Sequence, residues 1–444
     1  MKRRVAVMLG AALAAAGLAM GPARAATVLV VDDDFPRSCA AGAADHATIQ
    51  AAVDEAGPGG RIRVCPGTYT ETVTVPAHKH HLTIEGAKAG IDARRRSPTG
   101  GGGESIVAAD SADGAVRLLA DHVVWDGFRI FDNLEGPGMY TSPDASGYVI
   151  RNTVFVNNGL GLYLNASGKA LAKVRHNRFT ANNEFEGPGA GYGIYSDQGA
   201  RCVVIADNLF EHHNGGGILF ADSGKPQHCV TVERNKSIDD RSFATFYASS
   251  HVRVVANFVR GRPDDSEPGS AIFIGARNKD VVVKRNHIEA TAGNGIDVRD
   301  TGGDGEDGVP PQNVDVLKNK VRTAGENGID VSATGVGEYE VRGNVSLRNV
   351  AVGIHAGPDT DEAVFAHNLA RGNGFLDCQD ESPGDGTAGD GTAGTDNTWR
   401  RNAGGSDDPD GICHAHLDKP KHKHKKKHRH KHKHKPKPCY PWRN

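Results

Sequence analysis

The sequence predicts an all-β protein, a right-handed parallel β-helix built from three sheets. Three observations support this prediction. A short unit centred on an Asn recurs about every 27 residues, each unit contains three short stretches with strand-like alternation, and no unit has an amphipathic run of helix length. Each strand can then pair with its copy in the next unit, because the rest of the coil provides the crossover that parallel pairing needs.

The repeating unit consists of a V-x-V-like stretch, an Asn, an apolar residue, a polar turn and then G-I-x-V. Its clearest copies begin at Val281 and Val314. With Asp126 as a first member, the Asn positions are Asn152, Asn177, Asn208, Asn235, Asn257, Asn286, Asn319, Asn344, Asn368 and Asn397. Asn tolerates a left-handed backbone at a tight bend, and stacked copies can pass amide hydrogen bonds along the rod. We therefore expect these residues to form one column.

The composition excludes several other classes. Gly contributes 57 of 444 residues, below the one-third of a collagen, and no long apolar run follows the first 25 residues. Residues 1–25 are typical of a secretory signal peptide, with a charged start and an A-x-A-like cleavage site before Ala26. We expect a protein that is secreted or associated with the cell surface of a bacterium, and that has no transmembrane span.

Seven cysteines remain in the mature chain, and export favours disulfides. The first pair flanks a predicted helix, the second pair lies one repeat period apart, and the third brackets a Gly/Asp-rich loop. The expected pairs are Cys39 with Cys65, Cys202 with Cys229, and Cys378 with Cys413, which leaves Cys439 over. These pairings are hypotheses, since spacing alone does not fix connectivity.

The segment ATIQAAVDEAGPGGRIRVCPGTYTETVTV, followed by HLTIEGA, resembles the N-terminal part of secreted right-handed β-helix proteins of the pectate-lyase-like superfamily. The repeats are similar to those of the same group, and the resemblance covers about residues 28–412. The group includes polysaccharide lyases, mannuronan epimerases and periplasmic copper-maturation proteins. The resemblance implies a short amphipathic helix that closes the N-terminal end of the rod.

The residues before the first repeats fit such a closing helix. Ile49, Ala52 and Val53 fall on one helical face, and Asp45 or Thr48 is the candidate N-cap. The sequence thus divides into a signal peptide at 1–25, an N-terminal cap with the first coils at 26–125, the β-helix repeats at 126–413 and a disordered tail at 414–444.

The x position of G-I-x-V points outward if Ile and Val point into the core. Through the coils it reads Tyr163, Tyr195, Leu219, Phe246, Phe273, Asp297, Asp330 and His355. Sugar rings stack their flat C–H faces on aromatic side chains, so Tyr163, Tyr195, Phe246 and Phe273 are candidate contacts for an extended polysaccharide. Two alternatives stay open: a loop covers the stripe, or the register is shifted by one residue and these side chains lie in the core.

The ionisable end of this column is a candidate catalytic site. Asp297 and Asp330 should lie about 5 Å apart on neighbouring coils, where two carboxylates can share a proton or Ca2+. His355 can move protons, and Arg299 can neutralise a uronate. The resemblance implies a lyase or epimerase in which a base removes the C5 proton. However, neither the D-P-H-D-like motif of epimerases nor the N-T-D and G-H-G motifs of polygalacturonases occurs.

Two further segments carry potential metal ligands. Asp300, Asp304, Glu306 and Asp307 lie in one Gly-rich turn, where oxygen ligands suit Ca2+, although the spacing is not that of an EF-hand and a solvated loop is the simpler interpretation. Ca2+ is the only cofactor that the sequence suggests. The tail histidines, candidates for Zn2+, Ni2+ or Cu2+, are His422, His424, His428, His430, His432 and His434.

The tail is also strongly basic. Residues 419–444 hold 12 Lys and Arg and no Asp or Glu, so the rest of a chain with a net charge of −2 carries −14. A flexible polycation of this kind binds anionic polymers without sequence specificity, and it can also fold back on an acidic body.

Taken together, these patterns predict a protein that binds polysaccharide or another cell-envelope polyanion through an outward-facing sheet and is retained at the surface by its tail. No specific nucleic-acid partner is expected. The alternatives are an acidic-polysaccharide lyase or epimerase and an extracytoplasmic metal-binding protein.

Overall fold

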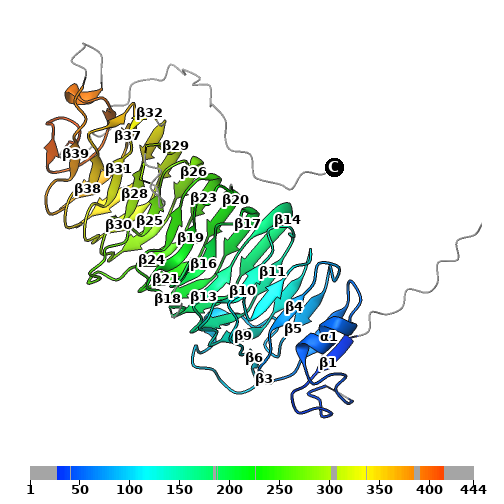
Figure 1. The fold of residues 1–444 in the computed structure, drawn as a ribbon. Helices are drawn as coiled ribbons and strands as arrows, with labels where there is room; N and C mark the ends of the chain where they lie inside the picture. Colours follow the sequence, from blue (N-terminus) through cyan, green and yellow to red (C-terminus); the bar gives the residue numbers. More distant parts are fainter. Residues whose placement is uncertain are drawn as a thin grey trace, which may run out of the picture.

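The computed structural model describes residues 28–40, 42–183, 187, 189–225, 227–301, 308–336, 338–384 and 391–414. Three long sheets of parallel strands run along a common axis and form a rod, with α1 (Ile49–Glu55) at its N-terminal end (Figure 1). This is the predicted three-sheet solenoid. The predicted signal peptide, and the tail beyond His414, lie outside the described residues.

The 14-stranded sheet contains, in order, β1 (Val28–Val31), β2 (Arg61–Val64), β5 (Thr83–Glu85), β8 (Val124–Asp126), β11 (Val149–Arg151), β14 (Ala166–Arg175), β17 (Ala200–Ala206), β20 (Gln227–Glu233), β23 (Ser249–Val255), β26 (Lys279–Lys284), β29 (Gln312–Leu317), β33 (Tyr339–Arg342), β37 (Val364–Ala366) and β40 (Thr398–Arg400).

The 13-stranded sheet contains β4 (Val73–Val75), β7 (Val116–Leu118), β10 (Pro137–Thr141), β13 (Leu160–Tyr163), β16 (Tyr192–Ser196), β19 (Gly216–Phe220), β22 (Ala244–Phe246), β25 (Ile272–Ile274), β28 (Ile296–Arg299), β31 (Ile329–Ser332), β35 (Ile354–Ala356), β39 (Cys378–Asp380) and β41 (Asp407–Asp408).

The 12-stranded sheet contains β3 (Gly67–Tyr69), β6 (Ser105–Val107), β9 (Phe128–Phe131), β12 (Val154–Val156), β15 (Arg178–Thr180), β18 (Leu209–Glu211), β21 (Lys236–Ile238), β24 (Phe258–Arg260), β27 (His287–Glu289), β30 (Lys320–Arg322), β34 (Val345–Leu347) and β38 (Leu369–Arg371). The pair β32 (Gly335–Val336) and β36 (Thr360–Asp361) and two short 3-10 turns, Ala93–Arg95 and Thr392–Gly394, complete the elements.

An asparagine ladder joins the coils at the corner between the 14-stranded and 12-stranded sheets. Each member donates its Nδ2 hydrogen to the Oδ1 of the next member at 2.9–3.1 Å, and that same oxygen accepts the backbone N–H of the preceding member. The members are Asn177, Asn208, Asn235, Asn257, Asn286, Asn319, Asn344, Asn368 and Asn402. All are buried, so the ladder satisfies polar groups that water does not reach.

The predicted ladder is right in its centre and wrong at its ends. Thr153, not Asn152, is opposite Asn177, and its N–H donates to the Oδ1 of Asn177. Asn402 replaces Asn397 at the other end, and Asp126 lies on β8, paired with Arg151. The left-handed bend also falls one residue earlier than expected, at positions such as Asp207 and Arg234, because the Asn side chain has to point inward.

The interior is filled by stacked side chains. Ile and Val of successive coils alternate with outward residues along the strands, and most are completely buried. Phe155, Phe179 and Phe210 stack one coil apart, with ring centroids 4.7 and 5.0 Å apart. In-register pairing thus places like side chains on top of one another.

Helix α1 covers one end of this core, as the sequence predicts. Ile49, Ala52 and Val53 are fully buried, and Thr48 is the N-cap, its Oγ1 accepting the N–H of Ala51 at 3.2 Å. Asp45 does not cap the helix. The Glu71 carboxylate, which the sequence did not indicate, accepts the first two backbone N–H groups at 2.7 and 2.9 Å and complements the helix dipole.

Two of the three predicted disulfides are present: Cys39–Cys65 and Cys378–Cys413, with Cα atoms 5.5 and 6.3 Å apart. The pairing of Cys202 with Cys229 is wrong. Cys202 is a free thiol, whereas Cys229 is disulfide-bonded, and not to Cys202. The two residues do lie opposite each other on adjacent strands. Because the Cα–Cβ bonds of two such residues point in parallel directions, their Cβ atoms stay about one strand spacing, ~4.8 Å, apart. The Cβ atoms of a disulfide lie ~3.5–4.5 Å apart, so this pair is too far apart to form one.

In the part of the chain that the structure describes, no helix has the length and apolar character needed to cross a membrane.

We expect Asn235→Ala to destabilise the rod, because it leaves the backbone N–H and the side-chain amide of Asn208 without their shared acceptor. Each stranded donor costs about 1–3 kcal/mol, so the free energy of unfolding should fall by about 2 kcal/mol or more. Thermal and urea denaturation followed by circular dichroism measure this change. The control Lys236→Ala, at an exposed neighbouring position, should stay within about 0.5 kcal/mol. Equal stability of the two variants would contradict a stabilising role for the ladder.

Candidate functional site

The outward residues of the 13-stranded sheet form one continuous column. Each member is paired directly with the next, from Tyr140 through Tyr163, Tyr195, Leu219, Thr245, Phe273, Asp297 and Asp330 to His355. The column therefore passes from apolar and aromatic side chains to ionisable ones, as the sequence predicts. Its aromatic part begins one coil earlier than expected, at Tyr140, which is preceded in the column by Arg117 and Thr74.

Phe246 does not belong to this column. It is paired with Phe220 and Ile274, is completely buried, and stacks on the Phe220 ring with centroids 5.3 Å apart. Thr245 takes the outward position. Its unit lacks the G-I-x-V pattern, and an error of one residue exchanges the two faces of a strand. The prediction of Phe246 as a polysaccharide contact is therefore wrong.

Tyr195 is in the column but is only 5% exposed. The segment at Gly189 lies against its ring, so closely that a Cβ added at Gly189 would stand 2.4 Å from the ring Cγ. The alternative of a covering segment holds at this position. Tyr195 supports its neighbours rather than presenting a free ring face.

Tyr140 and Tyr163 are half-buried and meet edge to face, with ring centroids 5.4 Å apart. Gln198 joins their hydroxyls: it accepts from Tyr140 at 3.1 Å and donates to Tyr163 at 2.8 Å. The Tyr163 hydroxyl donates to Asp197, and burial together with this carboxylate raises the pKa of Tyr163. Both rings are thus held in place with neutral hydroxyls.

A second aromatic pair lies further along the column. Phe273 is half-buried, and its ring centroid is 5.5 Å from that of Tyr247 at a tilted angle. Leu219 lies between the two aromatic pairs and is also half-buried. The described column thus offers apolar surface over several coils before it becomes polar.

Arg299 bridges the two predicted catalytic carboxylates. Its Nε donates to Asp297 at 2.7 Å and its Nη2 donates to Asp330 at 2.9 Å. Both carboxylates are only 3% exposed, whereas the Arg299 side chain is 34% exposed. The structure therefore brings the three residues together, with the guanidinium on the solvent side.

Other polar side chains complete the hydrogen bonds of these carboxylates. Ser270 donates to Asp297 at 2.9 Å, Ser332 donates to Asp330 at 2.6 Å, and the Asn294 amide donates to both, at 3.1 and 3.3 Å. Every carboxylate oxygen thus accepts at least one hydrogen bond. This arrangement lets the carboxylates orient Arg299 and His355.

His355 forms a dyad with Asp330. Its Nδ1 is 2.8 Å from Asp330 Oδ1, and its Nε2 is 3.6 Å from a carboxylate oxygen of Glu381, whose side chain is largely exposed. The carboxylate fixes the orientation of the ring and leaves Nε2 as the nitrogen on the outer side. An imidazole held in this way can accept or donate a proton at Nε2.

The pKa values of the cluster diverge. Burial raises the pKa of Asp297, and the charge of Asp330 adds to this effect, although Arg299 opposes it. Burial also acts to raise the pKa of Asp330, but hydrogen bonds from His355 and Ser332 bring it below the ordinary value. Burial acts to lower the pKa of His355, yet the hydrogen bond and charge of Asp330 raise it above the ordinary value. The dyad therefore favours an imidazolium beside a carboxylate.

The ligand geometry does not favour Ca2+ at this cluster. The Nε and Nη2 of Arg299 occupy the positions between the two carboxylates that a bridging cation would need. In the predicted acidic turn, Asp300 accepts a hydrogen bond from Thr334 at 2.8 Å, while Asp304, Glu306 and Asp307 lie outside the described residues. The tail histidines, His422, His424, His430 and His432 among them, also lie outside them.

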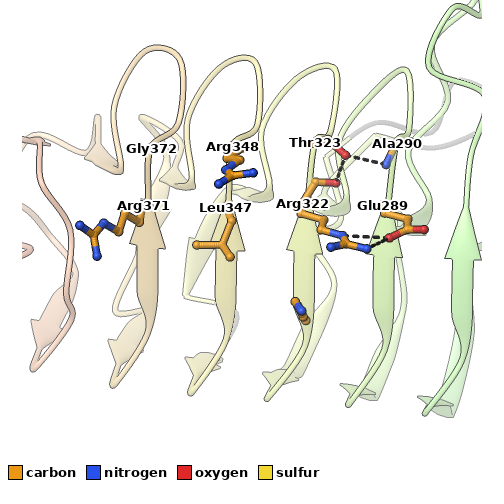
Figure 2. A pocket seen from close by; sticks show the side chains of 9 residues that line it. Glu289, Ala290, Arg322, Thr323, Leu347, Arg348, Arg371 and Gly372 are labelled. Atoms are coloured by element: carbon orange, nitrogen blue, oxygen red, sulfur yellow. Dashed lines mark hydrogen bonds and ion pairs between the residues drawn. The ribbon is translucent and has the colours of Figure 1, made fainter.

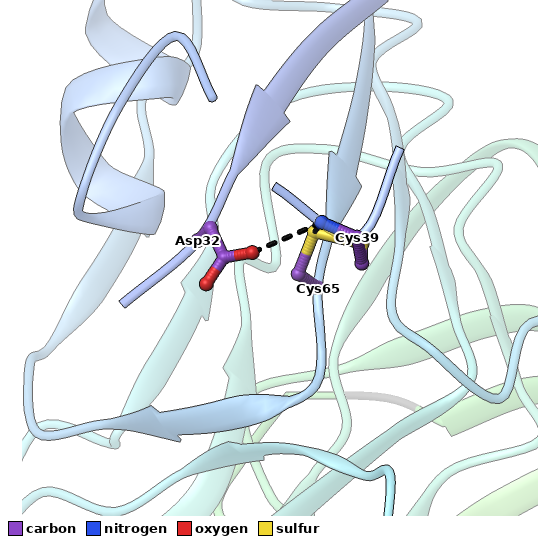
Figure 3. A group of neighbouring side chains, drawn as sticks. All are labelled: Asp32, Cys39 and Cys65. Carbon is purple, nitrogen blue, oxygen red and sulfur yellow. Dashed lines mark hydrogen bonds between the residues drawn. A yellow bond between two sulfur atoms is a disulfide. The ribbon is translucent and has the colours of Figure 1, made fainter. Parts of the chain in front are cut away.

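Two groups near the N-terminus of the described chain have the composition of a metal site. In one, Asp32, Asp33 and Asp34, the first two carboxylates accept the backbone N–H groups of Asp34 and Thr68. In the other, the ligand atoms of Asp32, Cys39 and Cys65 lie within 4.8 Å of one another (Figure 3). However, the two sulfur atoms form a disulfide, and the Asp32 carboxylate accepts the N–H of Cys39 at 3.1 Å. These contacts explain the cluster as a brace of the N-terminal segment.

Sequence reasoning missed Ser270, Asn294, Ser332 and Glu381. A signal was present for three of them. Ser332 lies two residues after Asp330 and so shares its face. Asn294 precedes G-I-D-V, and Asn327 holds the same place in the next repeat; the Oδ1 of Asn294 accepts the N–H of Asn327 at 2.9 Å. Ser270 holds the place of Asn294 one repeat earlier, three residues before Phe273. Glu381 comes from the turn that follows β39.

Comparison with known proteins agrees with this geometry. The family model described as "Right handed beta helix region" matches residues 83–210 and 192–370. The chain belongs to this family. The right-handedness predicted from the repeats is thus that of its family. No curated protein matches the sequence.

Several solved structures are similar to this chain at low identity. DFA-IIIase from Arthrobacter chlorophenolicus A6, in complex with DFA-III, is 16% identical over 79% of this chain and 89% of its own, with a TM-score of 0.46. The A-module of the mannuronan C-5 epimerase AlgE6 from Azotobacter vinelandii is 14% identical over 81% and 89%, with a TM-score of 0.36. PfbA, a surface adhesin of Streptococcus pneumoniae, is 12% identical over 74% and 86%, with a TM-score of 0.33. The similarity at these identities concerns the fold alone.

We expect the Asp330–His355 dyad to make stability depend on pH. The lowered pKa of Asp330 stabilises the fold above the ordinary carboxyl value of about 3.9, and this contribution disappears as pH falls through the lower folded value. The raised pKa of His355 stabilises the fold fully below about pH 6.5, and this contribution disappears as pH rises through the folded value. The destabilisation by His355→Gln should therefore be largest between about pH 4 and 6.5.

Thermal midpoints of wild type and His355→Gln across this range and up to about pH 9 measure the effect. The control His78→Gln, at an exposed position, should give a small and nearly flat difference. A difference for His355→Gln that does not change with pH would show that the dyad contributes no charge interaction.

Proposed function

We propose that this protein binds an extracellular polysaccharide along the outward face of the 13-stranded sheet. The observation that carries the proposal is the in-register column, in which half-buried Tyr140, Tyr163, Leu219 and Phe273 lead to the Arg299 and His355 cluster. The proposal includes retention at an anionic cell surface by the basic residues 419–444, which rests on their charge in the sequence.

The apolar part of the column suits an extended chain of sugars. Its members are spaced one coil apart, about 4.8 Å, so the column extends along the rod and does not gather in one deep cavity. Sugar rings present flat C–H faces that stack on aromatic rings, and the hydroxyls of Tyr140 and Tyr163 offer hydrogen bonds beside them. A linear ligand would therefore meet apolar contacts over several coils and hydroxyl groups beside Tyr140 and Tyr163.

The polar end of the column supplies directional contacts. The guanidinium of Arg299 is partly exposed and is held by Asp297 and Asp330, so it loses little freedom on binding. The His355 imidazole is held in the same way by Asp330. Two orienting carboxylates thus prepare two cationic or hydrogen-bonding groups for sugar hydroxyls or a uronate carboxylate.

A second candidate function is an acidic-polysaccharide lyase or epimerase, and the Asp330–His355 dyad favours it. In such a reaction, His355 in its neutral form would accept the C5 proton of a uronate at Nε2 while Arg299 stabilises the negative charge that develops on the carboxylate. In a lyase the C4–O bond then breaks and the departing oxygen takes up a proton. In an epimerase a proton returns to C5 from the opposite face.

We expect Tyr163→Ala and Phe273→Ala each to weaken binding of a long polysaccharide at least tenfold, which corresponds to about 1.4 kcal/mol. Affinity electrophoresis in gels that contain polygalacturonate, alginate or a neutral glucan measures this loss and shows which sugar binds. The control is Phe375→Ala, because Phe375 is 67% exposed and lies outside the column. If both column variants are retarded by the polysaccharide as strongly as the wild-type protein, the proposed binding face is refuted.

Incubation of the wild-type protein with polygalacturonate or alginate tests the second candidate. A lyase generates an unsaturated uronate, which is followed by its ultraviolet absorbance, and an epimerase changes the C5 configuration, which is followed by proton NMR. We expect neither product. A product that disappears in His355→Gln and persists in Phe375→Ala would establish catalysis in place of simple binding.

A further inference from the structure

The 12-stranded sheet carries a groove of about 880 Å³ on its outer surface, near the C-terminal end of the rod. The groove crosses β27, β30, β34 and β38 and the turns that follow them (Figure 2). It is lined by four cations, Lys320, Arg322, Arg348 and Arg371, and by a single acidic residue, Glu289. This surface belongs to a different sheet from the column described above.

The charge of the groove is only partly compensated. Arg322 pairs with Glu289, with its Nε 2.8 Å from the carboxylate. Within the residues that the structure describes, Lys320, Arg348 and Arg371 take part in no ion pair, and all three are exposed. The body of the chain is acidic overall, so three uncompensated cations in one groove stand out against their surroundings.

The repeat places these cations in line with the rod. Glu289, Arg322, Leu347 and Arg371 form one register column across four consecutive strands. Arg348 follows Leu347 at a left-handed position, with φ 54°. Successive strands are about 4.8 Å apart, so the groove extends roughly 14 Å along the axis. Charges that recur along a line match a ligand whose charges recur along a chain.

The side chains in the groove select the chemical class of this ligand. Arg guanidinium groups pair in a fork with carboxylate, sulfate or phosphate groups. The described lining contains no aromatic ring on which a nucleic-acid base could stack, and Leu347 is its largest apolar side chain. These features favour an anionic polysaccharide over a nucleic acid.

We propose that the groove on the 12-stranded sheet is a second binding site, specific for a linear anionic polysaccharide that carries carboxylate or sulfate groups. The site goes beyond the function proposed for the 13-stranded sheet and stands independently of it, since the two sites share no residue. Arg348 and Arg371 are its main contacts, and Lys320 contributes charge. Arg322 is oriented by Glu289 and presents its remaining edge to the groove.

The test is a double substitution in the full chain, Arg348→Asn with Arg371→Gln. Asn is chosen because it tolerates the left-handed backbone at position 348. The matched control, Lys173→Gln with Arg253→Gln, removes the same charge from the 14-stranded sheet. Residues 419–444 are unchanged in every variant, so their charge contributes equally to each measurement.

Binding is measured by calorimetry at several salt concentrations with polygalacturonate, a sulfated dextran and a DNA duplex as separate probes. We expect the groove variant to bind polygalacturonate or the sulfated dextran at least tenfold more weakly than wild type. The slope of the logarithm of the binding constant against the logarithm of the salt concentration should decrease in magnitude by about one for each cation removed. The carboxylated and sulfated probes show which anion the groove prefers.

Three outcomes would overturn the proposal: equal loss in the control variant, no loss in the groove variant, or binding of DNA that is as tight as that of the glycans and equally dependent on Arg348 and Arg371. Circular dichroism and thermal midpoints confirm that both variants fold. The groove substitutions should cause the same fold-loss in a Tyr163→Ala background as in the wild-type chain, which separates failure of this proposal from failure of the function proposed for the 13-stranded sheet.

Discussion

The structure depends on one constraint: every coil has to stack in register on the coil before it. The asparagine ladder enforces this register, because each buried amide bonds both the side chain and the backbone of its neighbour. Coils of different lengths are tolerated, since the additional residues enter turns and the ladder position stays fixed. The same register sorts the outer surface into columns, so a change of residue type from coil to coil becomes a change of chemistry along a line.

The two proposed binding surfaces illustrate this sorting. On the 13-stranded sheet the column changes from aromatic rings to a cluster in which Asp297 and Asp330 orient Arg299 and His355. On the 12-stranded sheet a groove across four coils gathers four cations and one carboxylate. Neither surface needs a deep cavity or a mobile loop among the described residues, because side chains on a rigid ladder of strands are already in place.

The fold and the direction of most side chains could be predicted from the repeat. Errors arose where a unit departs from it. The unit around Phe246 lacks the G-I-x-V pattern, so only the pairing with neighbouring strands shows which of its side chains point inward and which point outward. The cover over Tyr195 comes from a segment outside the repeat. The contacts of Arg299 with both carboxylates depend on side-chain geometry, which the spacing of residues in the sequence does not give. The spacing of Cys202 and Cys229 likewise shows that the two residues are close, but not the directions of their Cα–Cβ bonds.

The ladder also has a polarity. Each Asn donates one side-chain hydrogen to a carbonyl of the preceding coil and the other to the next Asn. The second hydrogen of Asn208 is therefore bonded only once Asn235 is in place, and that of Asn235 only once Asn257 is in place. During synthesis the N-terminal coils leave the ribosome first, with α1 already covering their outer end, and every later coil supplies the acceptor that its predecessor lacks. The chain can therefore wind up in the order in which it is translated, and a product that stops early would end in a row of unpaired donors.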